Sequence, residues 1–275
     1  MQPISIVGPG AFDLAGSLAD RLDGRVAVVD CDGGWDGAEP PVANHATEPA
    51  ATADTTIALD GDGSWAGRGR VDGLDDLLDG LAPDHGHLVA VGESRLRLPT
   101  ILLGGETEPA DVPGSVVVAA DAPAAVDLAG VVTALADAEP WVTRETLVRR
   151  VEASANADRA GAIATFTGRV RARDAPDDDR TTHLAFETYE GVAAERLETI
   201  AAELTDRDGV FDVRLHHRTG VIEAGEDIVF VVVLAGHRRE AFRTVEDGID
   251  RLKDEVPIFK KETTAAEEFW VHQRE

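Results

Sequence analysis

Three lysines stand close together near the C-terminal end of the sequence, and the chain contains no others. They are Lys253, Lys260 and Lys261, whereas the other 23 cations of the 275 residues are arginines. Arginine supplies charge and hydrogen bonds but keeps its proton, whereas lysine can release it and act as an acid, a base or a nucleophile. This distribution indicates a site that requires an amine. The alternative for Lys253 is that it only complements the C-terminal dipole of a helix that Pro257 ends.

A second group of residues suits an anionic ligand. His237 and Arg238 follow Gly236 at the predicted start of a helix, where free N–H groups and the helix dipole favour negative charge. Cations at this end are unfavourable for the helix itself, so their presence favours a bound anion over an exposed His-Arg pair. Arg169 and Arg171 lie two residues apart at the end of a predicted strand, and alternation places them on one face. They are either part of an anion site or a solvent-facing basic pair.

Histidine and cysteine spacing predicts neither a metal site nor a disulfide. His216 and His217 are adjacent in a predicted strand, so they point to opposite faces and are not a metal-binding pair. Cys31 is the only cysteine, which excludes a disulfide framework and a cysteine metal site. No other group of histidines or carboxylates has ligand spacing, so we expect no metal and no cofactor.

The chain is strongly acidic, with 52 aspartates and glutamates against 26 cations and a formal charge of -26. Because 43% of the residues are hydrophobic, the sequence is that of a folded protein rather than an acidic tail. An acidic surface with almost no lysine is typical of a protein from a high-salt cytoplasm, and it argues against nucleic acid as a partner. The sequence has no signal peptide and no long apolar run, so we expect a cytoplasmic protein that does not enter a membrane.

The two halves of the chain differ in charge and in structural pattern. Residues 1–140 carry 6 cations and 24 anions, net -18, whereas residues 141–275 carry 20 and 28, net -8. We therefore expect an anionic ligand in the second half. The length suits two domains of ordinary size, which we predict at residues 1–138 and 139–275.

The first half alternates short strands with helices, which predicts an α/β domain with a mostly parallel sheet. Its strands are predicted at residues 4–8, 25–30, 55–59, 88–91, 101–103 and 116–120, and its helices at 11–22 and 71–81. The second half has longer strands and two strongly periodic helices, which predicts an α+β domain. Its strands are predicted at residues 161–171, 182–189, 210–218, 227–235, 258–262 and 269–272, and its helices after a Thr143 cap, at 191–205 and at 238–254.

A glycine-bearing turn, Gly8-Pro-Gly10, joins the first strand to the first helix, which is the framework of a phosphate-binding loop. The P-loop motif has a glycine, a lysine and a serine or threonine where this chain has Asp13, Leu14 and Ala15. A carboxylate therefore stands where an anion would lie, and we favour a tight structural connection over a nucleotide site. In topology, residues 1–135 resemble the MobB-type adapter of molybdopterin guanine dinucleotide synthesis, which implies a P-loop-like domain with a degenerate loop.

The second half carries several motifs that resemble one known family. In order and spacing they are similar to the large subunit of molybdopterin synthase, the MoaE family, over about residues 143–275. The motifs are Phe166-Thr-Gly-Arg-Val-Arg171, His217-Arg218-Thr-Gly220, Gly225-Glu226, Ala235-Gly-His237-Arg238, Leu252-Lys253, Val256-Pro-Ile-Phe-Lys-Lys-Glu262 and Trp270-Val271. Phe259 stands where the family commonly has tryptophan, which keeps an aromatic residue at that position.

The resemblance implies a fold, a reaction and partners. The fold is an α/β hammerhead, and the reaction converts cyclic pyranopterin monophosphate to molybdopterin. Sulfur comes from a ubiquitin-like small subunit whose C-terminal Gly-Gly carries a thiocarboxylate, and two sulfur transfers build the dithiolene. Large subunits form a homodimer with one small subunit at each end, which makes a heterotetramer.

The resemblance also implies roles for individual residues. Lys253 matches the key catalytic lysine of the family, and Lys260 matches its second lysine, which we also expect to bind the substrate. The residues that match the substrate pocket are Arg171, His237 and Arg238, together with Arg274, which the family contributes across the dimer.

Two other functions stay open from the sequence alone. In the first, the lysine cluster accepts covalent attachment of a ubiquitin-like protein, and the chain is a modified scaffold. In the second, the first half is a binding adapter that recruits a nucleotide-handling partner. An intact anion pocket beside the lysines favours the enzyme.

Overall fold

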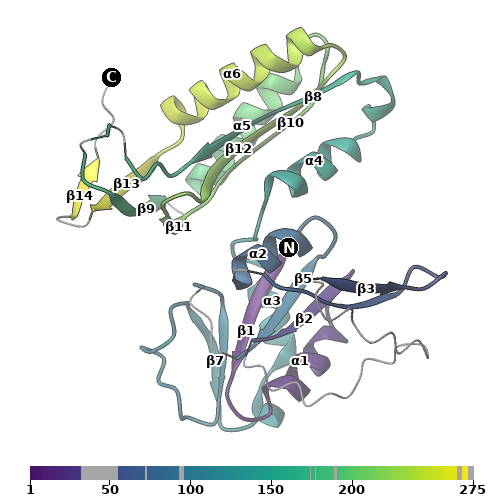
Figure 1. Ribbon diagram of the computed structural model, residues 1–275, viewed down its shortest axis with the longest axis vertical. Coiled ribbons are helices and arrows are strands. Elements are labelled where there is room, and N and C mark those ends of the chain that lie inside the picture. Colours follow the sequence, from purple (N-terminus) through teal and green to yellow (C-terminus); the bar gives the residue numbers. More distant parts are fainter. Residues whose placement is uncertain are drawn as a thin grey trace. The chain divides into compact units, whose positions relative to one another are not determined.

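The computed structural model describes residues 1–31, 55–71, 73–92, 96–173, 175–176, 178–188, 191–264 and 268–271. The chain divides into two compact units, Met1–Trp141 and Val142–Glu275 (Figure 1). The first and last residues of the first unit are hydrogen-bonded to each other, because the backbone N–H of Trp141 donates to the Met1 carbonyl at 2.8 Å. The indole Nε1 of Trp141 also donates to Asp79 Oδ1 at 2.7 Å, which fixes the end of this unit on its own surface.

The N-terminal unit is built on a parallel sheet of five strands in the order β2-β5-β1-β6-β7. The strands are β1 (Gln2–Val7), β2 (Val26–Asp30), β5 (His87–Val91), β6 (Thr100–Leu103) and β7 (Val116–Ala120). The predicted α/β domain with a parallel sheet is confirmed. A separate antiparallel hairpin consists of β3 (Thr56–Leu59) and β4 (Trp65–Arg68).

Helices cover both faces of the parallel sheet, which explains its nearly continuous apolar strands. They are α1 (Ala11–Ala19), α2 (Leu74–Leu81) and α3 (Leu128–Ala136). In β5, Val89 and Val91 pack in the cluster with α1 and α3, whereas Leu88 and Ala90 pack in the cluster with α2. The sequence did not predict α3, because its run of small and apolar residues has no polar face that would display the helical period.

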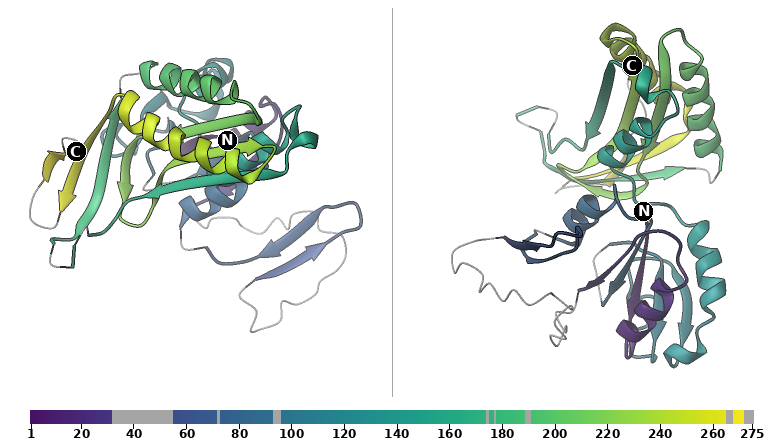
Figure 2. Two further views of the ribbon diagram at one scale, coloured as in Figure 1. Left: turned by 90° about the horizontal axis from the view of Figure 1, so that it is seen from above. Right: turned by 90° about the vertical axis from the view of Figure 1, so that its right-hand side faces the viewer.

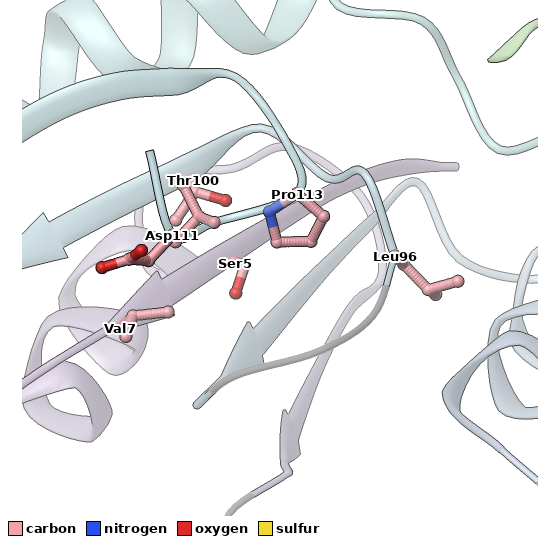
Figure 3. A pocket seen from close by; sticks show the side chains of 7 residues that line it. Ser5, Val7, Leu96, Thr100, Asp111 and Pro113 are labelled. Carbon is pink, nitrogen blue, oxygen red and sulfur yellow. The ribbon is translucent and has the colours of Figure 1, made fainter. Parts of the chain in front are cut away.

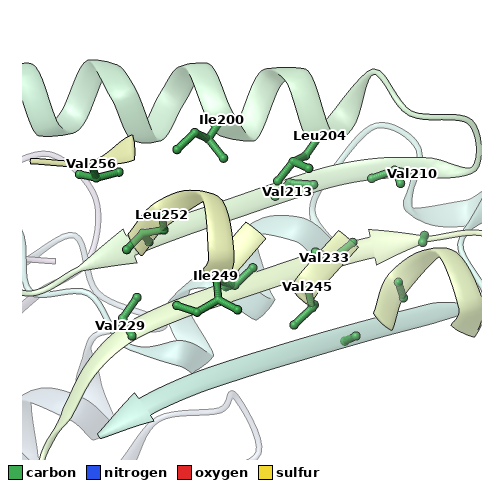
Figure 4. Packing of buried hydrophobic residues seen from close by; sticks show 14 of the residues in the cluster. Ile200, Leu204, Val210, Val213, Val229, Val233, Val245, Ile249, Leu252 and Val256 are labelled. Carbon is green, nitrogen blue, oxygen red and sulfur yellow. The ribbon is translucent and has the colours of Figure 1, made fainter. Parts of the chain in front are cut away.

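The C-terminal unit contains an antiparallel sheet in the order β10-β12-β8, with helices on both faces (Figures 1 and 2). Its elements are α4 (Arg144–Glu152), β8 (Ala162–Arg169), α5 (Val192–Thr205), β10 (Val210–His217), β12 (Asp227–Ala235) and α6 (Arg238–Glu255). On one face, α5 and α6 bury Ile200, Leu204 and Ile249 against Val233 of β12 (Figure 4). On the other face, α4 packs against the alternate residues of β12, so this strand is apolar almost throughout.

A second antiparallel sheet, in the order β11-β9-β13-β14, lies beside the Arg169 end of the first. Its strands are β9 (Thr181–Thr188), β11 (Gly220–Glu223), β13 (Ile258–Thr264) and β14 (Glu268–Val271). Val170 and Phe186 belong to its small core, and Ile258 packs against both this core and the main one. The predicted α+β domain is confirmed, including the cap of α4, where Thr143 Oγ1 accepts from the Thr146 N–H at 3.1 Å.

Candidate active site

The last turn of α6 carries Lys253, and a network of charged side chains holds this turn against α5. Arg251 donates from Nε to Glu255 at 2.7 Å and also pairs with Glu203 of α5. Arg196 of α5 pairs with the same Glu255 carboxylate, and the Arg251 guanidinium holds the pKa of that carboxyl below its usual range. The network fixes the helix end at which the exposed Lys253 lies.

Lys260 and Lys261 lie on opposite faces of β13. Lys260 is directly opposite Phe186 of β9, and Lys261 is opposite Ala185. Because directly paired residues of antiparallel strands project to the same side, Lys260 shares a face with buried Phe186, and Lys261 does not. Lys260 is half-buried, and its ammonium group makes no hydrogen bond or ion pair among the residues that the structure describes.

One of the two arginines at the end of β8 belongs to the framework. Arg169 pairs through Nε with Asp227 Oδ1 at 3.0 Å. Arg169 and Arg171 are exposed on either side of buried Val170, as strand alternation requires. Val170 lies in the same apolar cluster as Phe186, so Arg171 is at the end of the unit where the two predicted catalytic lysines lie.

His237 and Arg238 lie at the opposite end of α6. His237 is the residue before the helix, in an extended conformation, and Arg238 is the first helical residue. Both are exposed, and neither side chain has a hydrogen-bond or ion-pair partner within the described part of the chain. Arg238 precedes Lys253 by 15 positions, so the two residues are about 22 Å apart along the helix axis, at about 1.5 Å per residue.

The predicted site residues of one chain therefore fall into two separate groups. We call Arg171, Lys253 and Lys260 the lysine end, and His237 and Arg238 the anion end. Arg274, the remaining predicted site residue, lies outside the described residues. The chain alone does not bring the two ends together, because the whole length of α6 separates them.

Two aromatic rings lie beside the lysine end, and the sequence singled out one of them only weakly. His217 packs edge-on against Phe186, with ring centroids 4.9 Å apart and an angle of 70°. Its Nδ1 is 2.7 Å from the Arg218 carbonyl, which can only accept, so Nδ1 carries the proton. Burial lowers the pKa of His217 to about 4. The sequence did not single out Phe186. It predicted the strand at 182–189 that contains this residue, but not the pairing of that strand with β13.

The neighbouring histidine faces the other side of β10. His216 stacks on Phe230 of β12, with ring centroids 6.4 Å apart, and burial lowers the pKa of His216 to about 3. The two adjacent histidines therefore support different layers of the unit, as their alternation predicts.

The glycine turn of the N-terminal unit is closed by packing. Gly8 and Gly10 have φ angles of 113° and 79°. A Cβ atom on Gly8 would lie 2.1 Å from the Leu103 carbonyl oxygen, and one on Gly10 would lie 2.8 Å from Pro123. Asp13 lies in the first turn of α1. These are the contacts of a tight strand-helix connection, and they do not show a P-loop.

A small pocket of the same unit lies between β1 and β6, under the segment that follows β6 (Figure 3). It is lined by Ser5, Val7, Leu96, Thr100, Asp111, Val112 and Pro113. The hydroxyls of Ser5 and Thr100 donate to backbone carbonyls at 3.1 and 2.9 Å. Its charged lining residue is Asp111, whose carboxylate repels a phosphate.

Within the described ranges, no cluster of three or more His, Cys, Asp or Glu residues is placed to hold a metal ion. The helices described there include none that is long and apolar enough to cross a membrane.

Known proteins match the C-terminal unit, and one of them matches the whole chain. The family model described as MoaE protein matches residues 140–255. A probable molybdopterin synthase of Haloferax volcanii is 51% identical over 276 residues, which cover 100% of both chains. The molybdopterin synthase structure from Staphylococcus aureus is 30% identical and covers 49% of this chain and 93% of its own, with a TM-score of 0.43. A complex of subunits 1 and 2 of the molybdopterin-converting factor from Helicobacter pylori is 23% identical and covers 48% and 86%, with a TM-score of 0.40. Because the likeness to the Haloferax volcanii protein extends over the whole length, the chain belongs to the MoaE family.

Proposed function

We propose that this protein is the large, catalytic subunit of a molybdopterin synthase and acts in molybdenum cofactor biosynthesis. Its family and its full-length relative support this activity. The observation that carries the proposal is the lysine end, where the end of α6 and strand β13 hold two amines at the same end of the unit as Arg171. An amine there can release a proton and take one up again, which the arginines used elsewhere in the chain cannot do.

The substrate in this proposal is cyclic pyranopterin monophosphate, and the sulfur donor is a thiocarboxylated ubiquitin-like small subunit. In each of two transfers the thiocarboxylate sulfur forms a carbon–sulfur bond on the pterin, and water then cleaves the bond between that sulfur and the acyl carbon, leaving the small subunit with a carboxylate. Together the two transfers open the cyclic phosphate. Lys253 acts at the reacting carbon or carries the proton, and Lys260 stabilises the charge that develops there. His237, Arg238, Arg171 and Arg274 hold the phosphate and the pterin, since charge-assisted contacts at a helix N-terminus suit a phosphate.

These roles require two copies of the chain, because one α6 keeps its own two ends about 22 Å apart. A site that combines amines with the phosphate-binding pair therefore takes its lysine end from one copy and its anion end from the other. This geometry supports the homodimer and gives it two equivalent sites. The small subunit at each end is what the resemblance to the family implies.

An edge strand supplies a route to such a dimer. Among the strands that the structure describes, β8 pairs with β12 alone, so its other edge presents unpaired backbone groups. Antiparallel pairing of two copies of β8 about a two-fold axis places the Arg169 end of one strand beside the Ala162 end of the other. Ala162 is opposite Ala235, two residues before His237. The arrangement therefore sets the lysine end of one copy next to the anion end of its partner.

Sulfur transfer to the pterin tests the proposal. Purified chain in high salt is mixed with the thiocarboxylated small subunit and cyclic pyranopterin monophosphate, and dithiolene product is measured. Lys253→Arg keeps the charge and the fold but should lower turnover by about 100-fold or more, as loss of a proton carrier does. Lys261→Arg is the matched control, because Lys261 projects from the other face of β13 and should keep its activity.

Two results would each contradict one part of the proposal. Wild-type turnover in Lys253→Arg would leave the synthase standing but would remove the role given to the Lys253 amine. The other is a folded wild-type protein that makes no dithiolene but becomes linked to the small subunit through a lysine, which would favour the scaffold.

For the N-terminal unit, we propose a degenerate P-loop-like domain at residues 1–138 that precedes the synthase domain at 139–275. The glycine turn after β1 and the parallel sheet support the likeness, and Asp13 supports the loss of phosphate binding. Titration of the whole chain with guanine and adenine nucleotides should show no saturable binding. Saturable binding would instead support a nucleotide-handling adapter.

A further inference from the structure

We infer that His217 is a positioning residue for Lys260 and acts on it through the ring of Phe186. The importance of Lys260 rests on the proposed function, whereas the contacts that link the three residues do not. None of the roles proposed above for the lysine or anion end uses His217.

Phe186 is the centre of this arrangement. It is only 5% exposed, and in the sheet it stands between Lys260 on β13 and Gly220 on β11. Residues directly opposite each other in antiparallel strands have Cβ atoms about 5 Å apart and project to the same side. The aliphatic part of Lys260 therefore runs along the Phe186 side of the sheet. Gly220 has no side chain, so the aromatic contact of Phe186 comes from His217 of the other sheet.

A hydrogen bond holds the His217 ring in one orientation. Its Nδ1–H donates to the Arg218 carbonyl at 2.7 Å, and a ring flip would lose this bond. Arg218 is itself held, because its guanidinium donates to the Asp227 carbonyl at 3.1 Å. The ring edge then meets Phe186 at 4.9 Å and 70°, which is a favoured edge-to-face geometry. A fixed histidine thus fixes the phenyl ring beside which Lys260 lies.

The neutral state of the ring suits this role. Burial disfavours the charged imidazolium, so His217 adds no positive charge beside the Lys260 ammonium group. It provides shape and a fixed neighbour. The other charged side chain on this face of β13, Glu262, accepts a hydrogen bond from Thr181 Oγ1.

The small number of lysines gives a direct test. The chain has three lysines, so the labelling rate of each by an amine-reactive reagent can be followed by mass spectrometry of its peptides. The quantity to measure is the rate at Lys260 divided by the rate at Lys261, which is on the same strand but the opposite face. In His217→Ala this ratio should change roughly two- to tenfold, the population shift that one edge-to-face contact can supply.

Two further variants separate positioning from general damage. His217→Phe keeps a ring but loses the Nδ1–H bond to the Arg218 carbonyl, so its ratio should lie between those of the wild type and His217→Ala. His216→Ala is the matched control, because it removes an adjacent, half-buried ring that packs on Phe230 and not on Phe186. It should lower the melting temperature and leave the ratio unchanged.

An unchanged ratio in folded His217→Ala would overturn the inference, and so would an equal change in His216→Ala. If His217→Ala does not fold, His217→Asn replaces it, because its amide can still donate to the Arg218 carbonyl while the ring is absent. The labelling needs no substrate. A failed sulfur-transfer assay would therefore refute the proposed function without affecting this measurement.

Discussion

Mild acid should destabilise the C-terminal unit, because the fold keeps two histidines neutral. Burial lowers the pKa of His216 from 6.5 to about 3 and that of His217 from 6.5 to about 4. In the unfolded chain both are free to bind a proton near pH 6.5, so the unfolded state holds more protons than the folded state below that pH. The stability that these neutral rings contribute is present above pH 6.5 and is lost as the pH falls towards 4.

The size of the loss follows from the two pKa values. At pH 5 the protonated form of an unfolded histidine outnumbers the neutral form by about 30 to one. This favours unfolding by about 2 kcal/mol per residue relative to pH 7. The two histidines together remove about 4 kcal/mol, a large share of the 5 to 15 kcal/mol or so of a typical domain. Urea unfolding of the full chain at pH 7 and pH 5, at one high salt concentration, measures the change.

Carboxylates also titrate in this range, so the decisive comparison is with His216→Phe. This variant keeps an aromatic ring against Phe230 and removes one titrating group. Its free energy of unfolding should fall by about 2 kcal/mol less between pH 7 and pH 5 than that of the wild type. Equal losses in the two proteins would refute the buried neutral state of His216.

Three substitutions test the packing. Gly8→Ala should destabilise the N-terminal unit by about 2 kcal/mol or more, because it combines a positive φ with a Cβ 2.1 Å from the Leu103 carbonyl oxygen. Gly24→Ala is the control, because Gly24 also has a positive φ but open space around it, and it should lower stability less in thermal unfolding. Equal losses of stability in the two variants would contradict the clash. Thr143→Ala should cost about 1 kcal/mol in urea unfolding through loss of the α4 cap, and Thr143→Ser should restore most of it. Leu204→Ala should cost about 2 to 5 kcal/mol, because Leu204 is 0% exposed in the main core; a loss below about 1 kcal/mol would contradict that packing.

Much of the fold could be predicted because the apolar pattern repeats with the period of the element that it forms. The stripe of α6 shows this helical period and lies in the main core. The run Val229–Ala235 was predictable for another reason, because it is a short, continuous apolar segment that packs in cores on both faces of the sheet. The elements that escaped prediction lack such a pattern. The hairpin strand β4 includes a glycine and an arginine in four residues, and β11 is a four-residue strand that directly follows a turn.

The site was less predictable, because chemistry-bearing motifs carry no distances. The sequence predicted that Lys253 and His237 serve one pocket, yet the predicted length of their common helix already separates them. Strand alternation could have told Lys260 from Lys261, but only the register with Phe186 shows which face is the inner one. The framework role of Arg169 also depends on register, since its partner Asp227 lies 58 positions along the chain.

In the proposed dimer, each active site combines the lysine end of one copy with the anion end of the other. The Lys253→Ala and Arg238→Ala proteins should each be inactive alone. They are mixed in equal amounts, unfolded and refolded together. Half of the resulting dimers are mixed, and each mixed dimer has one intact site, so about a quarter of the wild-type sulfur-transfer activity should return. The matched mixture of Lys253→Ala with Lys260→Ala should stay inactive, because both residues come from the same copy. No recovery in the first mixture, or equal recovery in both, would contradict the shared site.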